Sequence, residues 1–127
     1  MTTKEYVNSI QKVVSENKII ICSDIHFEEI SQNICYLKGK LEILDKSNLF
    51  FVEFVVINTK PFLEKYKYHW QDEDNNQLAR WDNVKHHQHI PTFPHHYHDK
   101  TDKPFPSEPM TLEKILLKIE KKVALNL

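Results

Sequence analysis

The sequence predicts an α+β fold, in which a mostly antiparallel sheet of four to five strands has an N-terminal helix, a C-terminal helix and a long loop rich in histidine and proline. Helical periodicity occurs at both ends of the chain, strand-like apolar segments lie between them, and short polar turns join these segments. Short turns can join antiparallel strands but not parallel ones. With 127 residues and 40% hydrophobic content, residues 1–127 are expected to form a single domain.

The first helix is predicted to run from Thr2 to about Asn17. Thr2 and Glu5 have the spacing of a capping box, in which each side chain binds the backbone N–H group of the other residue. Apolar residues then recur at the spacing of one helix face: Tyr6, Val7, Ile10, Val13 and Val14. This helix is therefore expected to be amphipathic.

Three segments after this helix have the character of strands. Residues 19–22 are a short β-branched run, and residues 37–43 alternate between apolar and charged side chains. Turn residues at 45–48 precede the apolar run 49–57, in which Phe50, Val52, Phe54 and Val56 would line one face. We expect this last strand to be central in the sheet.

A hairpin is predicted next, because residues 66–71 and 78–82 flank the polar turn 72–76. Pairing that is symmetric about Asp74 places Tyr68 opposite Arg80 and Tyr66 opposite Asp82. A slip of one residue would instead place His69 beside Arg80.

Residues 83–109 are predicted to form an extended loop. Five prolines interrupt them and forbid a helix, and they disfavour a central strand. These prolines are Pro91, Pro94, Pro104, Pro106 and Pro109. A loop of this length in a small domain is typical of a functional segment or of a disordered one.

Thr111 is predicted to cap the closing helix. Its apolar side is formed by Leu112, Ile115, Leu116, Ile119 and Val123. The lysines near its end complement the helix dipole and indicate nothing further.

Composition excludes several classes of protein. A formal net charge of −1 supplies no global attraction to nucleic acid, so any such binding must be local. Cys22 and Cys35 lack metal-binding spacing and are expected to be buried free thiols. The longest apolar run, 49–57, is interrupted by Glu53 and is too short to span a bilayer. We therefore expect a soluble, cytoplasmic protein without membrane association.

The histidines indicate where function is concentrated. Seven of the eight lie between His69 and His98. In an extended chain alternate side chains point the same way, so His87 with His89, and His96 with His98, could each present two imidazoles to one point. Histidine titrates near neutral pH, so the charge of this region depends on its surroundings.

The residues that follow one another here match a known pattern. They are Tyr66-Lys67-Tyr68-His69-Trp70-Gln71, Arg80-Trp81-Asp82-Asn83, His86-His87, Thr92-Phe93-Pro94-His95-His96-Tyr97-His98 and Pro106-Ser107-Glu108. This half of the chain resembles the TumE family of toxins from prokaryotic toxin-antitoxin modules. Tyr97 stands where a basic residue is common in that family. The resemblance implies a growth-inhibiting toxin, a partner antitoxin and RNA as the suspected substrate.

One chemistry that fits is metal-independent cleavage of RNA, which needs no cofactor. One imidazole would remove the proton of the ribose 2′-hydroxyl and another would protonate the leaving oxygen, while Arg80 stabilises the phosphorane and Asp82 orients a histidine. The candidate acids and bases are His69, His86, His87, His95, His96 and His98. The candidate substrate-binding residues are Tyr68, Trp70, Trp81 and Asn83. We expect His69 or His87 to lie close to Arg80.

Two alternatives remain open. Imidazoles from His87, His89, His96 and His98, with Asp82 or Asp99, could hold a divalent metal ion such as Zn²⁺, Mn²⁺ or Ni²⁺ that activates water. The loop could instead be a docking surface for a partner protein, without catalysis, and a homo-oligomer is also possible. The aromatic residues have a plain explanation too, because alternation within a packed strand would produce them without any role in stacking on bases.

Overall fold

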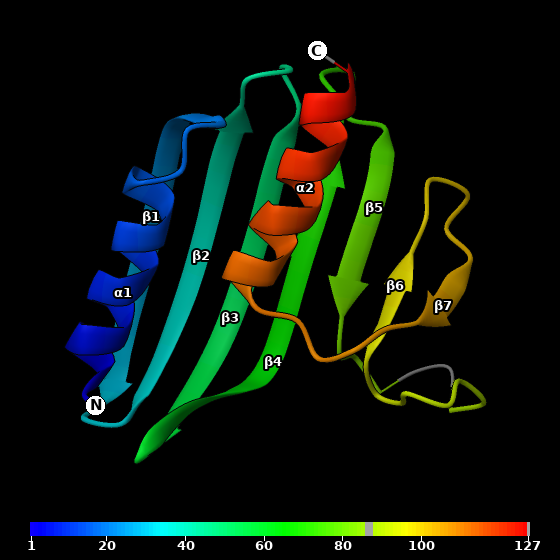
Figure 1. Cartoon of the computed structure of the whole chain (residues 1–127). Coiled ribbons are helices and arrows are strands. Elements are labelled where there is room, and N and C mark those ends of the chain that lie inside the picture. The colour runs from blue at the N-terminus through cyan, green and yellow to red at the C-terminus, as the bar shows by residue number, and fades with distance from the viewer. Residues whose placement is uncertain (86–87, 127) are drawn as a thin grey trace.

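The computed structural model describes residues 1–85 and 88–126 and shows one antiparallel sheet with two helices on the same face (Figure 1). The elements in order are α1 (Thr3–Ser15), β1 (Ile20–Ser31), β2 (Ile34–Ile43), β3 (Asn48–Asn58), β4 (Lys60–Gln71), β5 (Gln77–Asp82), β6 (His96–His98), β7 (Pro104–Pro106) and α2 (Leu112–Asn126). Each strand pairs with the next in sequence, so the sheet is a meander from β1 to β7. We call the face beneath the helices the helix face and the opposite one the open face.

The core lies between the helices and the helix face. The apolar sides of α1 and α2 pack on alternate residues of the strands, so both predicted helices are confirmed, including the Thr2 capping box. The sheet contributes fully buried side chains such as Leu37, Leu41, Leu49, Phe51 and Tyr68. None of the described helices is long and apolar enough to cross a membrane.

The sheet has seven strands rather than the predicted four to five. β1 extends well past the short run at 19–22, because residues 23–31 pair with β2 as the outer arm of a long hairpin. Most of the additional β1 side chains are exposed. Within the predicted run, Cys22 was expected to be buried but is exposed, whereas Cys35 is buried as expected. Among residues 23–31 only Ile25, Phe27 and Ile30 are apolar, and they do not alternate regularly, so sequence alone understated the strand.

The prediction that residues 83–109 lack regular structure is wrong at two places, β6 and β7. β6 pairs with β5, and β7 pairs with β6 so that Pro104 lies opposite His98 and Pro106 opposite His96. The two prolines are tolerated because β7 is the outermost strand, where alternate backbone N–H groups need no partner in the sheet.

The β4–β5 hairpin has the slipped register. Gln71 pairs with Gln77, as symmetry about Asp74 requires, but a bulge follows and His69 then pairs with Arg80. The predicted pairs of Tyr68 with Arg80 and of Tyr66 with Asp82 are therefore wrong. An extra residue in one strand of an antiparallel pair shifts every later pair by one, and the pattern of apolar residues does not reveal it.

β3 is apolar on both faces. Its buried residues, such as Leu49 and Phe51, face the helices, whereas Phe50, Val52, Phe54 and Val56 alternate with them and are half-buried on the open face. The expected grouping of these four side chains on one face is confirmed. Their face is nevertheless the one that the helices leave uncovered.

Candidate functional site

The candidate site lies on the open face, where two rows of side chains cross β4, β5 and β6. One row consists of Lys67, Asp82 and His96, and the adjacent row of His69, Arg80 and His98. Residues paired directly across antiparallel strands point to the same face, so all six share the open face. We call His69, Arg80, Asp82, His96 and His98 the open-face cluster.

Asp82 is the hydrogen-bond acceptor at the centre of the cluster. Its Oδ1 lies 2.9 Å from Nε2 of His96 and accepts from the backbone N–H of Val84 at 3.1 Å. Its Oδ2 accepts from Nε of Arg80 at 3.2 Å. The Asp82 side chain is only 4% exposed, so these partners replace water in stabilising the carboxylate.

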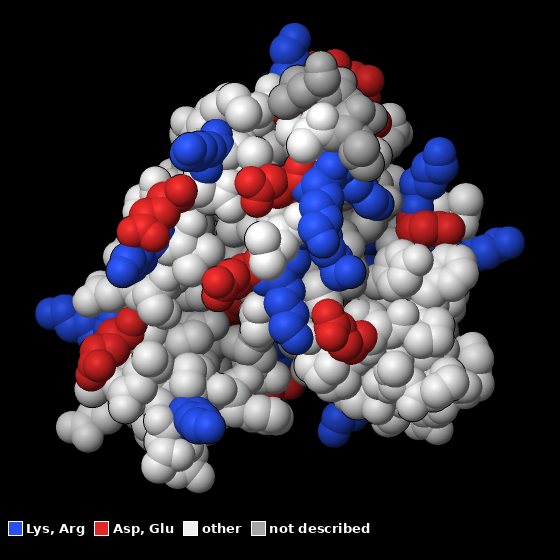
Figure 2. Space-filling model, viewed as in Figure 1, with Lys and Arg blue, Asp and Glu red and all other residues white. Residues whose placement is uncertain are grey.

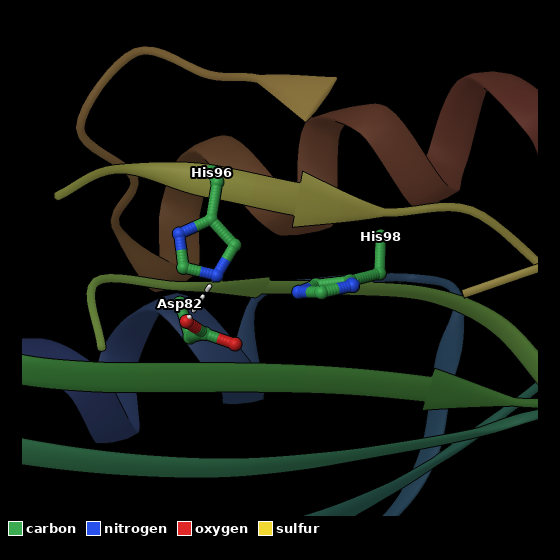
Figure 3. A group of neighbouring side chains, drawn as sticks. All are labelled: Asp82, His96 and His98. Atoms are coloured by element: carbon green, nitrogen blue, oxygen red, sulfur yellow. Dashed lines mark ion pairs between the residues drawn. The ribbon is translucent and has the colours of Figure 1, made fainter. Parts of the chain in front are cut away.

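His98 is held in one tautomer by the backbone. Its Nδ1 lies 3.1 Å from the carbonyl oxygen of Asp102 and 3.3 Å from the carboxylate of the same residue. Both groups only accept hydrogen bonds, so Nδ1 must carry a proton. In the neutral ring the lone pair is then on Nε2, and this end of the ring points toward Asp82 and His96 (Figure 3).

His96 is constrained in the same way, with a different consequence. Its Nδ1 donates to the carbonyl oxygen of Pro94 at 2.9 Å, and its Nε2 faces the Asp82 carboxylate. A lone pair on Nε2 would repel this carboxylate. A cation must therefore lie between the two atoms, either as a proton shared by His96 and Asp82 or as a metal ion.

Arg80 connects the buried and exposed parts of the cluster. Its side chain is 25% exposed, and its Nη1 lies 3.7 Å from Asp102. A hydrogen bond from Gln77 lowers the pKa of Asp102, and the charges of Arg80 and His98 lower it further. The guanidinium is thus bracketed by the two carboxylates of Asp82 and Asp102.

His69 lies beside Arg80 in the same row. This confirms the expectation that either His69 or His87 lies close to Arg80. Burial lowers the pKa of His69, and the neighbouring charges of Lys67 and Arg80 lower it further. Within the described part of the chain, Nε2 of His69 has no hydrogen-bond partner. A neutral imidazole next to a guanidinium is suited to accepting a proton.

Of the other predicted histidines, His95 lies on the opposite side of the sheet from the cluster. His95 lies against the core, where its Nδ1 is 2.8 Å from the hydroxyl of Tyr66 and the two rings stack. Burial lowers the pKa of His95 as well. His89 is exposed in the β5–β6 connection, and His86 and His87 lie outside the described residues.

The predicted substrate-binding residues are used for packing and positioning. The rings of Tyr68, Trp70 and Trp81 are buried on the helix face, as the plain explanation of alternation predicts. Asn83 accepts a hydrogen bond from the backbone N–H of Tyr66 and donates one to the carbonyl oxygen of Glu64. It therefore connects β4 to the end of β5.

A metal ion could be held by part of the cluster. One ligand atom each from Asp82, His96 and His98 lies within 4.8 Å of the others. Two imidazoles and a carboxylate suit Zn²⁺, Mn²⁺ or Ni²⁺, and the backbone carbonyls at both Nδ1 atoms are the outer partners that ligating histidines require. Asp99, the alternative carboxylate, instead binds Thr101 within its own turn.

Asp102, Gln77 and Lys67 are close to the site but were not among the candidates predicted from the sequence. Asp102 reaches the cluster only because the turn between β6 and β7 brings it back to His98, and that hairpin was predicted to be a loop. Lys67 and Gln77 enter through the register of the β4–β5 hairpin. The turn residues Asp99 to Asp102 were the one available signal for the β6–β7 hairpin.

These features define an α+β protein with a meander sheet, helices on one face, and an imidazole, carboxylate and guanidinium cluster on the other. The family described as Toxin TumE matches residues 10–124 of the 127. The chain belongs to the TumE toxin family, which confirms the resemblance of its motifs and supports a toxin role. Neither a curated protein nor a solved structure matches the chain.

Proposed function

We propose that this toxin is a ribonuclease that cleaves RNA at the open-face cluster by histidine acid–base chemistry. The observation that carries the proposal is the row in which Arg80 lies directly between His69 and His98. Neighbouring strands are about 4.8 Å apart, so the two histidine Cα atoms are separated by roughly 10 Å. A phosphate bound by Arg80 would have an imidazole on each side.

The roles follow from the surroundings of each ring. His69 is neutral and accepts the proton of the ribose 2′-hydroxyl, which then attacks the phosphorus atom. His98 carries a proton on Nε2 and donates it to the leaving 5′-oxygen, with Asp102 and Asp82 stabilising its charged form. Arg80, whose side chain is 25% exposed, neutralises the charge that develops on the phosphorane.

Cleavage of RNA in EDTA tests this proposal. The purified toxin, freed of antitoxin, should cut RNA with a bell-shaped dependence on pH, and His69→Ala or His98→Ala should each reduce the rate by about 10²- to 10⁴-fold. His26→Ala is the matched control, because His26 is an exposed histidine on β1. Equal rates for His69→Ala and His26→Ala would exclude the assigned base.

Metal-assisted hydrolysis is the second candidate, favoured by the convergence of Asp82, His96 and His98. A bound divalent ion would polarise the phosphate and supply a hydroxide. In that case EDTA abolishes cleavage and Mn²⁺ or Zn²⁺ restores it. Toxicity without cleavage under either condition would favour a non-enzymatic toxin that acts through protein contacts.

Family membership also supports an antitoxin as a partner, and we propose that a protein encoded beside this chain neutralises it. Co-expression with the product of each neighbouring reading frame tests this. Relief of growth inhibition together with co-purification identifies the antitoxin, and relief by neither neighbour contradicts the proposal.

A further inference from the structure

A stripe of apolar side chains is left uncovered on the open face. Phe50, Val52, Phe54 and Val56 lie along β3, in the interior of the sheet, and all four are half-buried. The helices α1 and α2 both lie on the other face (Figure 1). A contiguous apolar stripe with polar borders is typical of a surface that binds a partner.

Lysines border this stripe on both sides. Lys38 and Lys67 lie opposite Val52 from β2 and β4, Lys40 lies opposite Phe50, and Lys65 lies opposite Phe54. All four lysines are exposed. The ammonium group of Lys40 lies 5.8 Å from the centre of the Phe50 ring.

The stripe and the open-face cluster form one continuous surface. A single row of paired residues crosses five strands, from Lys40 on β2 through Phe50, His69 and Arg80 to His98 on β6. A ligand that reaches Arg80 can therefore extend along β3 without changing face.

We infer that the open face binds single-stranded RNA on a lysine–phenylalanine platform, formed by Lys38, Lys40, Phe50, Phe54, Lys65 and Lys67. This rests on the proposed function, because it names how the RNA of that same site is held. Bases stack on the two phenylalanine rings and the lysines contact phosphates. Four residues of strand separate Phe50 from Phe54 by roughly 13 Å, which an extended RNA strand spans in about two nucleotides.

Acidic groups on β1 determine in which direction the bound RNA strand leaves the platform. Asp24 lies opposite Lys40, and Glu28 lies opposite Tyr36, both on the open face. Asp24 is already paired with His26 at 2.9 Å. These carboxylates repel phosphate at the β1 border, so the strand is expected to leave the platform toward the cluster. A duplex is disfavoured because its bases are already stacked.

A second basic surface lies on the opposite side of the molecule. A hollow of about 510 Å³ beside α2 is lined by Lys118, Lys121 and Lys122 together with Trp81 and Tyr97. Figure 2, which views the helix side, shows lysines gathered over α2. Lys122 also lies over the ring of Trp70, at 5.6 Å from its centre, and so has a structural role. Lys118 and Lys121 are therefore matched control residues, because they lie on the helix side and not on the open face.

The test measures binding of a fluorescent ten-nucleotide 2′-O-methyl RNA by anisotropy at several salt concentrations. This probe lacks the 2′-hydroxyl nucleophile, so wild-type protein can be used, and its integrity is checked on a gel. Lys38→Gln/Lys40→Gln and Lys65→Gln/Lys67→Gln should each weaken binding about tenfold at low salt, and each lost lysine should reduce the salt slope by about 0.7. Phe50→Leu and Phe54→Leu should each weaken it about fivefold.

The outcomes separate the platform from the ribonuclease. Platform-dependent binding without cleavage of natural RNA leaves the platform standing and contradicts the proposed function. If the protein cleaves natural RNA but both lysine double variants bind the probe as tightly as the wild type, the proposed function stands and the platform is contradicted. If only Lys118→Gln/Lys121→Gln weakens binding, the RNA binds on the helix face. If the wild type does not bind the probe at low salt, the apolar stripe is assigned to a protein partner. Either result overturns the platform. Circular dichroism confirms that each variant is folded.

Discussion

The hydroxyl of Tyr68 donates a hydrogen bond to Oε2 of Glu53 at 2.5 Å in the interior of the protein. Tyr6 donates to Oε1 of the same carboxyl group, so β4 and α1 are both connected to β3 through Glu53. Glu53 is fully buried, and it interrupts the longest apolar run of the sequence. Tyr68 thus supports the fold on the helix face, while the next residue, His69, belongs to the open-face cluster.

Glu53 should make stability depend on pH. Burial raises the pKa of Glu53, although the hydrogen bonds from Tyr6 and Tyr68 act in the opposite direction. A carboxyl group whose pKa is higher in the folded than in the unfolded state stabilises the fold fully below the unfolded pKa, about 4.3, and this contribution is lost as the pH rises through the folded pKa.

Urea denaturation of wild type and Glu53→Gln from pH 4 to pH 9 measures this effect. The free energy of unfolding of the wild type should fall relative to that of Glu53→Gln by up to about 1.4 kcal/mol per pH unit within the window. A difference that stays constant with pH would show that the folded and unfolded pKa values of Glu53 are equal.

Loss of either tyrosine hydroxyl should destabilise the protein. Tyr6→Phe or Tyr68→Phe leaves one oxygen of a buried carboxyl group without a donor, which costs about 1–3 kcal/mol. Tyr36→Phe, on the open face of β2, is the control and should cost less than 0.5 kcal/mol. Equal midpoints of urea denaturation for all three variants would contradict the role of Glu53.

Gly39 should not tolerate a side chain. It lies opposite Phe51, and a Cβ atom at this position would overlap the Phe51 ring. Because Phe51 is itself buried, Gly39→Ala is expected to cost about 1–3 kcal/mol. Adding Phe51→Leu to Gly39→Ala should recover part of this loss in a double-mutant cycle, whereas strictly additive costs would show that the ring is not the obstacle.

Much of the fold could be predicted from periodicity alone. Both helices, the β2 and β3 alternation and the antiparallel hairpins depend on local patterns that sequence displays directly. The bulge between Trp70 and Gln71 and the edge strand at Pro104 could not be predicted, because each depends on a neighbouring strand. The exposed length of β1 was missed because its three apolar residues, Ile25, Phe27 and Ile30, do not alternate regularly.

The candidate site was predictable by residue type more than by geometry. Arg80, Asp82, His96 and His98 were all candidates, and alternation correctly placed His96 and His98 on one face. The same alternation applied to His95 would have set it apart from them, since it is one residue from His96. The contribution of Asp102 depends on the β6–β7 turn, which the prolines concealed.

Arg80 should matter more for activity than for stability. Arg80→Ala removes one of the groups that binds Asp82, but the His96 and Val84 contacts to that carboxylate remain. If Arg80 stabilises the phosphorane, kcat/KM for RNA should fall about 10²- to 10³-fold. Arg80→Lys should recover only part of this loss, because an ammonium group lacks the planar fork. If Arg80→Ala lowers the free energy of unfolding in urea enough to account for the fall in kcat/KM, the role of Arg80 is purely structural.

The tautomer of His98 provides a test that requires no activity. Because the backbone carbonyl of Asp102 accepts from Nδ1, the neutral ring should carry its proton there and leave Nε2 unprotonated. Nitrogen-15 NMR at a pH where His98 is neutral distinguishes the two tautomers. Asp102→Asn should keep the same tautomer, since the substitution leaves the carbonyl in place. The exposed His26 serves as the reference for the opposite tautomer, because its Nε2 lies 2.9 Å from the carboxylate of Asp24. A proton on Nε2 of the neutral His98 ring would mean that the lone pair lies on Nδ1, away from Asp82 and His96. Nε2 could then neither take up the proton that it donates in the proposed reaction nor bind a metal ion.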